Sequence, residues 1–438
     1  GNIMDELIVG TYEGFLLGYS VLKETILHIF SDSKLYFQGK RLKQTFATHA
    51  HTASVKCIST AGKFLASGGT DDKVVIIDMK TRKEHTVLMN HDGTINAVAF
   101  THGGTHLLTG SDDGSIIVTR TGNWQIEKKW LKAHGGQPIT AIAVHPSDKL
   151  ALSIGGDKTL RTWNLVKGRP AFTINLASQG VTMPTDVTFS PGGDRFSLLS
   201  MQTVDVWTIS KAGVEKRVTC KSRPTAVQWT SDDRMLVGLE NGNIITLTVS
   251  DTKALTYQAH KQRVKCLHYE NNILYSSSSS GDMKVWSVDD SELSEICSIS
   301  AGCRITCVAL NRQNHLIKKE DKADEEQENS KDIEEVAPSK RKPGAFVTVS
   351  YGEEEETAPT PAKKLKKRKH NKKQKNKARL ISRNPLVLQA KFKALMSWLC
   401  SRERRPGIRL DHDPGFGDQV ITAERLLSDL RDPATRGT

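Results

Sequence analysis

The stretch HGGQPITAIAVHPSDKLALSIGGDKTLRTWN, residues 134–164, decides the fold because it alternates short apolar segments with turn residues. A first strand is expected at residues 140–145, where apolar side chains alternate. A second is expected at residues 150–154 after the turn Pro-Ser-Asp, and a third at residues 159–163 after Gly-Gly-Asp-Lys. Three short strands joined by tight turns form an antiparallel meander.

Four side chains stand at fixed places in this meander: His134, Ser153, Asp157 and Trp163. The histidine precedes the first strand, the serine lies in the second, the aspartate in the turn and the tryptophan in the third. An aspartate buried in a tight turn needs hydrogen-bond donors, which His, Ser and the indole N–H can supply. The set is typical of the structural relay in a WD repeat, and the meander is then one β-propeller blade.

The same pattern recurs along the chain. The matching residues are His51, Ser67 and Asp71 in a first unit, and His91, Thr109 and Asp113 in a second. The turn acids at positions 71, 113 and 157 are 113 − 71 = 42 and 157 − 113 = 44 residues apart. This spacing is that of WD repeats, which recur every ~40–45 residues.

Later copies of the pattern are weaker. Met201 and Asn241 occupy the turn-acid position of the fourth and fifth units. The sixth unit keeps three relay residues but has Ser280 in place of the acid; those three residues are His260, Ser276 and Trp286. The six continuous units begin near residues 51, 91, 134, 180, 222 and 260.

The two ends of the repeat region predict one further blade. Residues 7–20 match only the second and third strands of a blade, and residues 304–310 match only the first. Joining them leaves no open sheet edge inside the ring. We therefore expect an all-β, seven-bladed WD-repeat β-propeller over residues 1–312, with a closing blade shared by residues 7–48 and 304–310. Within that blade, residues 21–48 are expected to hold a loop plus the outer strand.

The composition changes after the propeller. Residues 313–362 are charge-dense with little to bury, which predicts a disordered linker. A basic run follows at residues 363–379, and residues 380–438 form a tail. Apolar spacing at residues 385–400 predicts a short amphipathic helix in that tail, and residues 418–431 can form a second.

The basic run holds eleven cations and no acid, so of the formal charge of +13 only 13 − 11 = +2 remains for the rest of the chain. The eleven are Lys363, Lys364, Lys366, Lys367, Arg368, Lys369, Lys372, Lys373, Lys375, Lys377 and Arg379. Such a run is typical of a nuclear import signal and also suits salt-sensitive RNA binding, and a merely solvated tail has the same composition. No aromatic residue is interleaved, so base stacking is not indicated.

Catalytic and cofactor motifs are not found in the sequence. The His-Ser-Asp sets resemble a hydrolase triad, but no Gly-x-Ser-x-Gly surrounds Ser153 and the spacing is that of a blade. Cys303 and Cys307 lie close together, but no second pair completes a zinc site. We expect no enzyme activity, no metal and no cofactor.

Cellular context follows from the same sequence. The seven cysteines are odd in number and scattered, which suits a reducing compartment. No apolar run approaches the about 20 residues needed to cross a bilayer, and the first residues lack a secretory pattern. A soluble intracellular protein without membrane contact is expected.

Several strings resemble one WD-repeat family in particular. They are HAHTASV at residues 49–55, LALSIGGDKTLRTWNLVKGRPAF at 150–172, AHKQRVK at 259–265 and the lysine-rich run. Together they are similar to the PAK-interacting WD-repeat protein family over residues 5–379. The resemblance implies a scaffold that binds preribosomal proteins and rRNA during nucleolar assembly of the large ribosomal subunit, including pre-rRNA processing. It also implies negative regulation of a p21-activated kinase.

Two hypotheses of function remain open on the sequence. In the first, the ring binds preribosomal proteins in the nucleolus while the basic run holds the particle electrostatically. In the alternative, the chain is a signalling adaptor that binds a kinase regulatory domain, and the basic run serves only nuclear import. The sequence departs from the family's pattern at Ser280 and in residues 380–438, which extend beyond the basic run.

Overall fold

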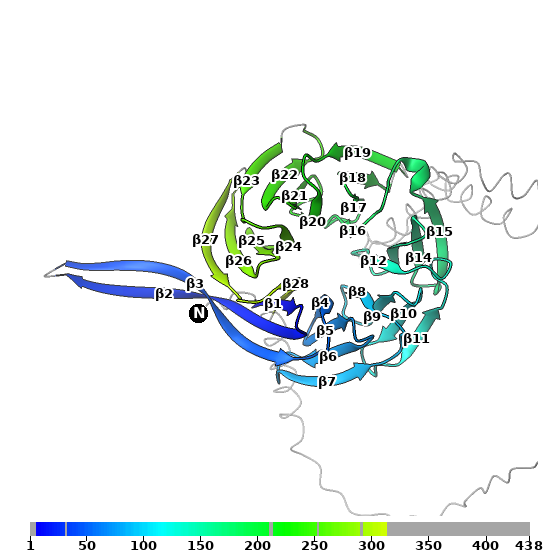
Figure 1. The fold of residues 1–438 in the computed structure, drawn as a ribbon, viewed down its shortest axis with the longest axis horizontal. Coiled ribbons are helices and arrows are strands. Elements are labelled where there is room, and N and C mark those ends of the chain that lie inside the picture. The colour runs from blue at the N-terminus through cyan, green and yellow to red at the C-terminus, as the bar shows by residue number, and fades with distance from the viewer. Residues whose placement is uncertain (1–5, 31–32, 210–212, 252–253, 290–291, 313–438) are drawn as a thin grey trace, which may run out of the picture. The chain divides into compact units, whose positions relative to one another are not determined.

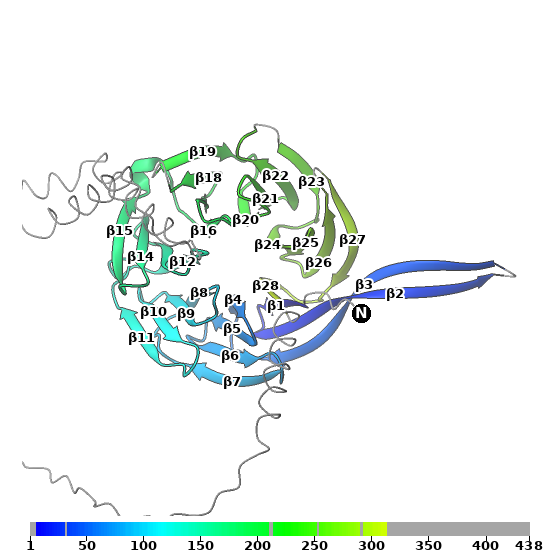
Figure 2. The ribbon, with the colours of Figure 1, turned by 180° about the vertical axis from the view of Figure 1, so that it is seen from behind.

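A computed structural model describes residues 6–30, 33–209, 213–251, 254–289 and 292–312, without the side chains of residues 22–40. Within these residues, 28 strands form seven four-stranded antiparallel sheets. The sheets are arranged as blades around a central axis (Figures 1 and 2). The predicted all-β, seven-bladed propeller is confirmed. The linker, basic run and tail helices predicted for residues 313–438 lie outside the described residues.

Blades 1 to 3, numbered in chain order, each place their first strand at the axis and their fourth at the rim. Blade 1 contains β4 (Val55–Ala61), β5 (Phe64–Gly69), β6 (Val74–Asp78) and β7 (Lys83–Leu88). Blade 2 contains β8 (Ile95–Phe100), β9 (His106–Ser111), β10 (Ile116–Arg120) and β11 (Ile126–Trp130). Blade 3 contains β12 (Ile139–Val144), β13 (Leu150–Gly155), β14 (Thr159–Asn164) and β15 (Arg169–Asn175).

Blades 4 to 6 repeat the arrangement, with a short 3-10 helix η1 (Ala177–Gln179) before blade 4. Blade 4 contains β16 (Asp186–Phe189), β17 (Arg195–Leu199), β18 (Thr203–Thr208) and β19 (Gly213–Thr219). Blade 5 contains β20 (Pro224–Trp229), β21 (Arg234–Leu239), β22 (Asn243–Thr248) and β23 (Ala254–Gln258). Blade 6 contains β24 (Val264–Glu270), β25 (Ile273–Ser278), β26 (Asp282–Val288) and β27 (Leu293–Ser300).

The closing blade joins the two ends of the ring. Its strand order is β28-β1-β2-β3, and these strands are β28 (Ile305–Asn311), β1 (Glu6–Thr11), β2 (Phe15–Phe30) and β3 (Ser33–His49). β1 and β28 are antiparallel, with Leu7 opposite Leu310 and Val9 opposite Val308. The pairing that the sequence predicts between the two termini of the ring is therefore present.

The outer hairpin of the closing blade differs from the prediction of a loop plus an outer strand. β2 and β3 pair continuously until Phe30 stands opposite Ser33, and this ribbon extends away from the ring (Figure 1). The sequence offers a reason: LKETILHIF and SKLYFQGK are rich in β-branched and aromatic residues, and no Gly or Pro interrupts either until Gly39. Strand pairing can therefore continue where a loop was expected.

The closing seam contains a buried acid. Glu6 on β1 is only 2% exposed. Its carboxylate accepts hydrogen bonds from Thr45 on β3 and from Asn311 Nδ2 on β28 (3.0 Å), and it forms an ion pair with Arg82 of blade 1 (2.7 Å). The guanidinium of Arg82 also lies 4.9 Å from the ring centroid of Phe46 on β3. One carboxylate thus joins three strands of the closing blade to its neighbour.

The core of the described residues is divided into seven apolar clusters, one at each interface between neighbouring blades. Because both faces of a blade pack against another sheet, its second strand is buried almost throughout: β13 is buried along its whole length. Outer strands face water, and four of the five residues of β11 are exposed. The blades are therefore wedges that depend on both neighbours.

Candidate functional site

The relay histidines and turn acids lie at one face of the ring. This face carries the turns between the second and third strands of each blade and the loops that lead from each outer strand to the next inner strand. We call it the relay face. Its loops begin near His51, His91, His134 and His260 in blades 1, 2, 3 and 6.

Blade 3 has the complete relay. His134 Nδ1 lies 2.8 Å from Asp157 Oδ1, His134 Nε2 lies 2.7 Å from Ser153 Oγ, and Trp163 Nε1 donates to Ser153 Oγ at 2.8 Å. Because the carboxylate only accepts, Nδ1 carries the proton, and in the neutral ring Nε2 accepts the serine hydroxyl proton. The donors therefore run in one direction, from indole to hydroxyl to imidazole to carboxylate.

Burial sets the charge states of this relay. Burial lowers the pKa of His134 below its ordinary value, although Asp157 acts in the opposite direction. Burial alone would raise the pKa of Asp157, but hydrogen bonds from His134 and Thr159 outweigh it and lower that pKa. A neutral imidazole and an ionised carboxylate are the result, which is the pairing that the donor direction requires.

Blades 1 and 2 contain shorter relays. His51 lies 2.9 Å from Asp71 and 2.8 Å from Ser67 through its two ring nitrogens. His91 makes the corresponding contacts at 2.9 Å and 2.8 Å, with Asp113 and Thr109. The tryptophan position holds Ile77 in blade 1 and Thr119 in blade 2, so neither relay receives an indole N–H. In each blade the carboxylate still fastens the interblade loop to the neighbouring turn.

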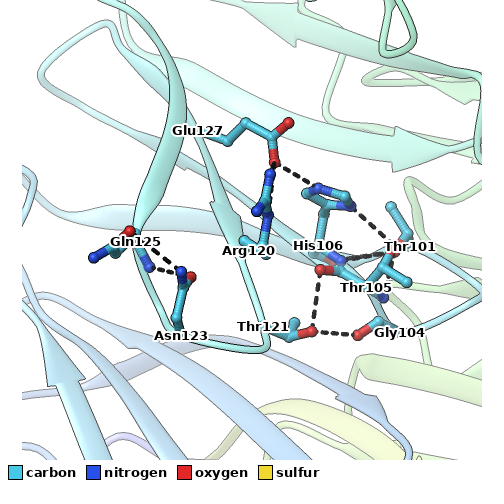
Figure 3. Close-up of polar contacts among 9 residues, drawn as sticks. All are labelled: Thr101, Gly104, Thr105, His106, Arg120, Thr121, Asn123, Gln125 and Glu127. Atoms are coloured by element: carbon cyan, nitrogen blue, oxygen red, sulfur yellow. Dashed lines mark hydrogen bonds and ion pairs between the residues drawn. The ribbon is translucent and has the colours of Figure 1, made fainter. Parts of the chain in front are cut away.

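Blade 2 has no Trp-Asp pair, and a different set of side-chain contacts holds its outer hairpin in place. Arg120 ends β10, and its Nη2 donates to Glu127 Oε2 at 3.2 Å (Figure 3). His106 Nε2 lies 2.8 Å from the same oxygen, and Thr121 Oγ1 donates to the carbonyl of Gly104 at 2.7 Å. These contacts hold β9, β10 and β11 together at the face opposite the relay.

Blade 6 brings three of its relay residues together but lacks the acid. His260 Nε2 and Trp286 Nε1 both lie 2.8 Å from Ser276 Oγ. Ser280 contacts Ser278 and Asp282 instead, so within the described residues the buried His260 Nδ1 has no hydrogen-bond partner. Burial, assisted by the nearby charge of Lys284, lowers the pKa of His260 to about 4.

The geometry of the relays suits a structural role. Ser67 and Ser153 are fully buried, and the hydroxyl of Ser153 lies between Trp163 and His134, where no substrate carbonyl can approach it. A hydrolase nucleophile must reach its substrate, so the triad hypothesis conflicts with this arrangement. The relays fix the positions of loops and turns.

Three further observations concern the described residues only. No group of three His, Cys, Asp or Glu side chains there is placed to hold a metal ion. Cys303 precedes β28 and Cys307 lies on it as free thiols, and burial raises the pKa of both. In the same part of the chain, no helix has the length and apolarity to span a bilayer.

Sequence reasoning missed a second feature of the relay face. Arg223, Arg263 and Arg304 each stand immediately before an inner strand, in RPTA, RVKC and RITC. An alignment of the interblade loops of successive repeats, rather than of their relay residues, would have revealed these three arginines. The cations that the sequence did single out, residues 363–379, lie outside the described residues.

The fold and the relays define a WD-repeat propeller. A family model for the WD domain, G-beta repeat, matches residues 40–78, 82–119, 125–164 and 252–287. The chain is 37% identical over 314 residues to p21-activated protein kinase-interacting protein 1-like of Xenopus laevis, covering 69% of this chain and 81% of that protein.

Two fungal proteins are similar as well. Shk1 kinase-binding protein 15 of Schizosaccharomyces pombe is 30% identical over 289 residues, covering 65% of this chain and 82% of that protein. Protein MAK11 of Saccharomyces cerevisiae is 22% identical over 373 residues, covering 74% and 88%. The chain belongs to the family of PAK-interacting WD-repeat proteins, and the resemblance found in the sequence is confirmed.

Proposed function

We propose that this chain is a non-enzymatic, protein-binding scaffold in the nucleolar assembly of the large ribosomal subunit, including processing of its pre-rRNA. One observation carries the proposal: the His, Ser and Asp side chains that could perform chemistry are buried in relays that fix loops. A ring built in this way offers a rigid set of surface side chains to partners. Its work is therefore binding.

The ribosomal part of the proposal is supported by the family resemblance and by the basic run. Eleven cations in residues 363–379 suit both import into the nucleus and electrostatic retention on an rRNA-containing particle. The ring is then the element that selects preribosomal proteins, and nucleus and nucleolus are the proposed location.

A second candidate function is binding and negative regulation of a p21-activated kinase. It is favoured by the names of the relatives, which describe a p21-activated protein kinase-interacting protein and an Shk1 kinase-binding protein. In the strict form of this alternative, the chain is a signalling adaptor for the kinase regulatory domain and the basic run serves only import.

Affinity purification from nuclear extract, combined with sedimentation of the same extract, separates these functions. The tagged full chain is compared with a variant in which all eleven cations of residues 363–379 are changed to Gln and an unrelated import signal is added. We expect the full chain to sediment with large-subunit precursors, and the variant to keep protein partners but lose salt-sensitive rRNA. Absence of the full chain from these precursors at low salt contradicts the ribosomal function. Recovery of kinase alone then establishes the adaptor.

A further inference from the structure

We propose that the relay face of blades 5, 6 and the closing blade is a docking surface for an acidic segment of a partner protein. The surface, called the basic arc below, consists of Lys221, Arg223, Lys261, Arg263 and Arg304. The inference rests on the proposed function only in that the chain binds proteins. It adds the place and the chemistry of the contact.

Equivalent backbone contacts fix the three arginines. The carbonyl of Arg223 accepts a hydrogen bond from Glu240 N at 2.8 Å, that of Arg263 from Ser279 N at 3.0 Å, and that of Arg304 from Tyr12 N at 2.9 Å. Each donor belongs to the turn between the second and third strands of the same blade. The three arginine residues therefore occupy the same repeat position in three consecutive blades.

The other blades show that this repeat position does not require arginine. In blades 1, 2 and 3 the same backbone bond is accepted by Ser54, Thr94 and Pro138. The loops and turns of blade 2 carry exposed acids instead, at Asp92 and Asp112. Arginine therefore occupies this position only in blades 5, 6 and the closing blade among those compared, and the fold itself does not demand that charge.

The cations of the arc have no carboxylate partner among the described residues. Lys221, Lys261 and Arg304 are exposed, and Arg223 and Arg263 are partly exposed. The one contact found for these side chains is that of Arg304, whose guanidinium lies 5.0 Å from the ring centroid of Tyr12. Guanidinium groups bind carboxylates through paired hydrogen bonds, so an acidic side chain is a suitable ligand for each.

Two further features point to a ligand at this surface. A hollow of about 450 Å³ adjoins Arg223 between blades 4 and 5 and is partly lined by Met201 and Cys220. The second feature is the buried His260 Nδ1, which lacks the carboxylate that its counterparts in blades 1, 2 and 3 contact. A peptide can place a side chain at the hollow, and the missing carboxylate leaves the loop that contains His260 with one contact fewer than the corresponding loops of blades 1, 2 and 3.

The same surface fits a protein segment better than RNA. Glu13 and Glu240 are exposed in the turns of the closing blade and blade 5, so a uniformly charged phosphate backbone would meet acids as well as arginines. A peptide can place carboxylates opposite the arginines and neutral side chains elsewhere. Single-stranded RNA also favours free aromatic rings for stacking, and the ring of Tyr12 already lies against Arg304.

Fluorescence anisotropy with purified protein tests the proposal. The probe is a labelled peptide of repeated Glu-Asp-Ser, and the protein is the full chain with the cations of residues 363–379 changed to Gln. We expect Arg223→Gln, Arg263→Gln and Arg304→Gln, combined in one variant, to weaken binding at least ~10-fold. The matched control combines Lys83→Gln, Lys128→Gln and Arg169→Gln, which remove equal charge from exposed outer strands and should change binding less than ~2-fold.

Each remaining outcome decides the question. Equal binding of the peptide by the two triple variants overturns the proposal. The proposal is also overturned if the parent protein binds an oligo(U) of equal length more tightly than the peptide and the arginine variant does not bind that oligo(U). If the arginine variant fails to fold, hydrogen exchange of the parent with and without peptide replaces it: protection is expected at residues 220–223, 259–263 and 301–304. Absence of protection there overturns the proposal. Because this assay contains neither preribosomes nor kinase, its result is independent of the sedimentation experiment.

Discussion

At the residue scale, the relay in blade 3 is a chain of hydrogen bonds in which each member depends on the next. Trp163 donates to Ser153, Ser153 to His134, and His134 to Asp157, at distances of 2.8, 2.7 and 2.8 Å. Because these groups are buried, a missing member leaves its neighbours without partners rather than with water. The relay was predictable from sequence because its four residues occupy fixed places in the blade: the interblade loop, the second strand, the turn and the third strand.

Ser153→Ala should cost more than the same change in blade 1. The substitution leaves two buried groups unpaired, the Trp163 indole and His134 Nε2, whereas Ser67→Ala leaves only His51 Nε2. At about 1–3 kcal/mol for each unpaired group, the expected losses are ~2–6 and ~1–3 kcal/mol. Equilibrium unfolding in urea measures both. Equal losses would show that the indole bond contributes nothing to the blade 3 relay.

Ser280→Asp should restore the missing acid of blade 6. In the wild type, the pKa of His260 is about 4 when folded and near 6.5 when unfolded. The unfolded state therefore binds a proton first, and stability is lost as the pH falls from 6.5 to about 4. A carboxylate at residue 280 should raise the folded pKa, reduce that loss, and add ~1 kcal/mol at neutral pH.

NMR titration of the histidine rings and urea unfolding at neutral and mildly acidic pH measure these effects. Ser279→Asp is the matched control, because it adds the same charge one residue away from the relay position. His268, whose pKa burial also lowers to about 4, serves as an internal reference that should not move. An unchanged His260 pKa in Ser280→Asp means that the new carboxylate does not reach Nδ1.

At the element scale, the closing blade shows where sequence reasoning succeeds and where it ends. The pairing of β28 with β1 was predictable. The N-terminal end of the repeat region matches a blade without its first strand, and the C-terminal end matches a first strand alone. The Glu6 contacts were not predictable, because Thr45, Arg82 and Asn311 are distant in sequence and follow no repeat spacing. The length of the β2–β3 ribbon also escaped prediction, since blade periodicity sets no limit on a hairpin that leaves the ring.

Glu6→Ala should loosen the closing seam selectively. It removes the partner of Arg82, whose side chain is only 31% exposed, and one acceptor of Asn311 Nδ2. Breaking a buried ion pair by removing one member typically costs ~3–5 kcal/mol. The rate of hydrogen exchange should increase more in β1 and β28 than in blade 3. Glu13→Ala removes an exposed acid from the same blade and should leave the exchange rates unchanged. Acceleration that is no greater in β1 and β28 than in the other blades would contradict a local role for Glu6.

At the scale of the whole ring, stability is shared. Each of the seven apolar clusters contains residues from two adjacent blades, so the loss of one blade uncovers a face of each neighbour. Closure by β28 leaves no terminal blade from which unfolding could begin inside the ring. A ring of this kind should unfold as one cooperative unit, unlike an open repeat array, in which each unit contacts only its neighbours and ends can fray.

The test combines two distant substitutions. Ser153→Ala in blade 3 and Glu6→Ala in the closing blade share no hydrogen-bond partner, so their free-energy losses should add within ~0.5 kcal/mol. Each substitution should lower the midpoint temperature of the same calorimetric transition, by about 2 °C for each kcal/mol lost. Near-UV circular dichroism reports on aromatic rings such as the stacked pair of Trp130 and Trp163, which lie far from the seam in sequence. If the ring unfolds cooperatively, this signal should have the same midpoint as the calorimetric transition. Two resolved transitions in the double variant would mean that the closing blade opens alone, and that the ring is held by its seam rather than by cooperation among blades.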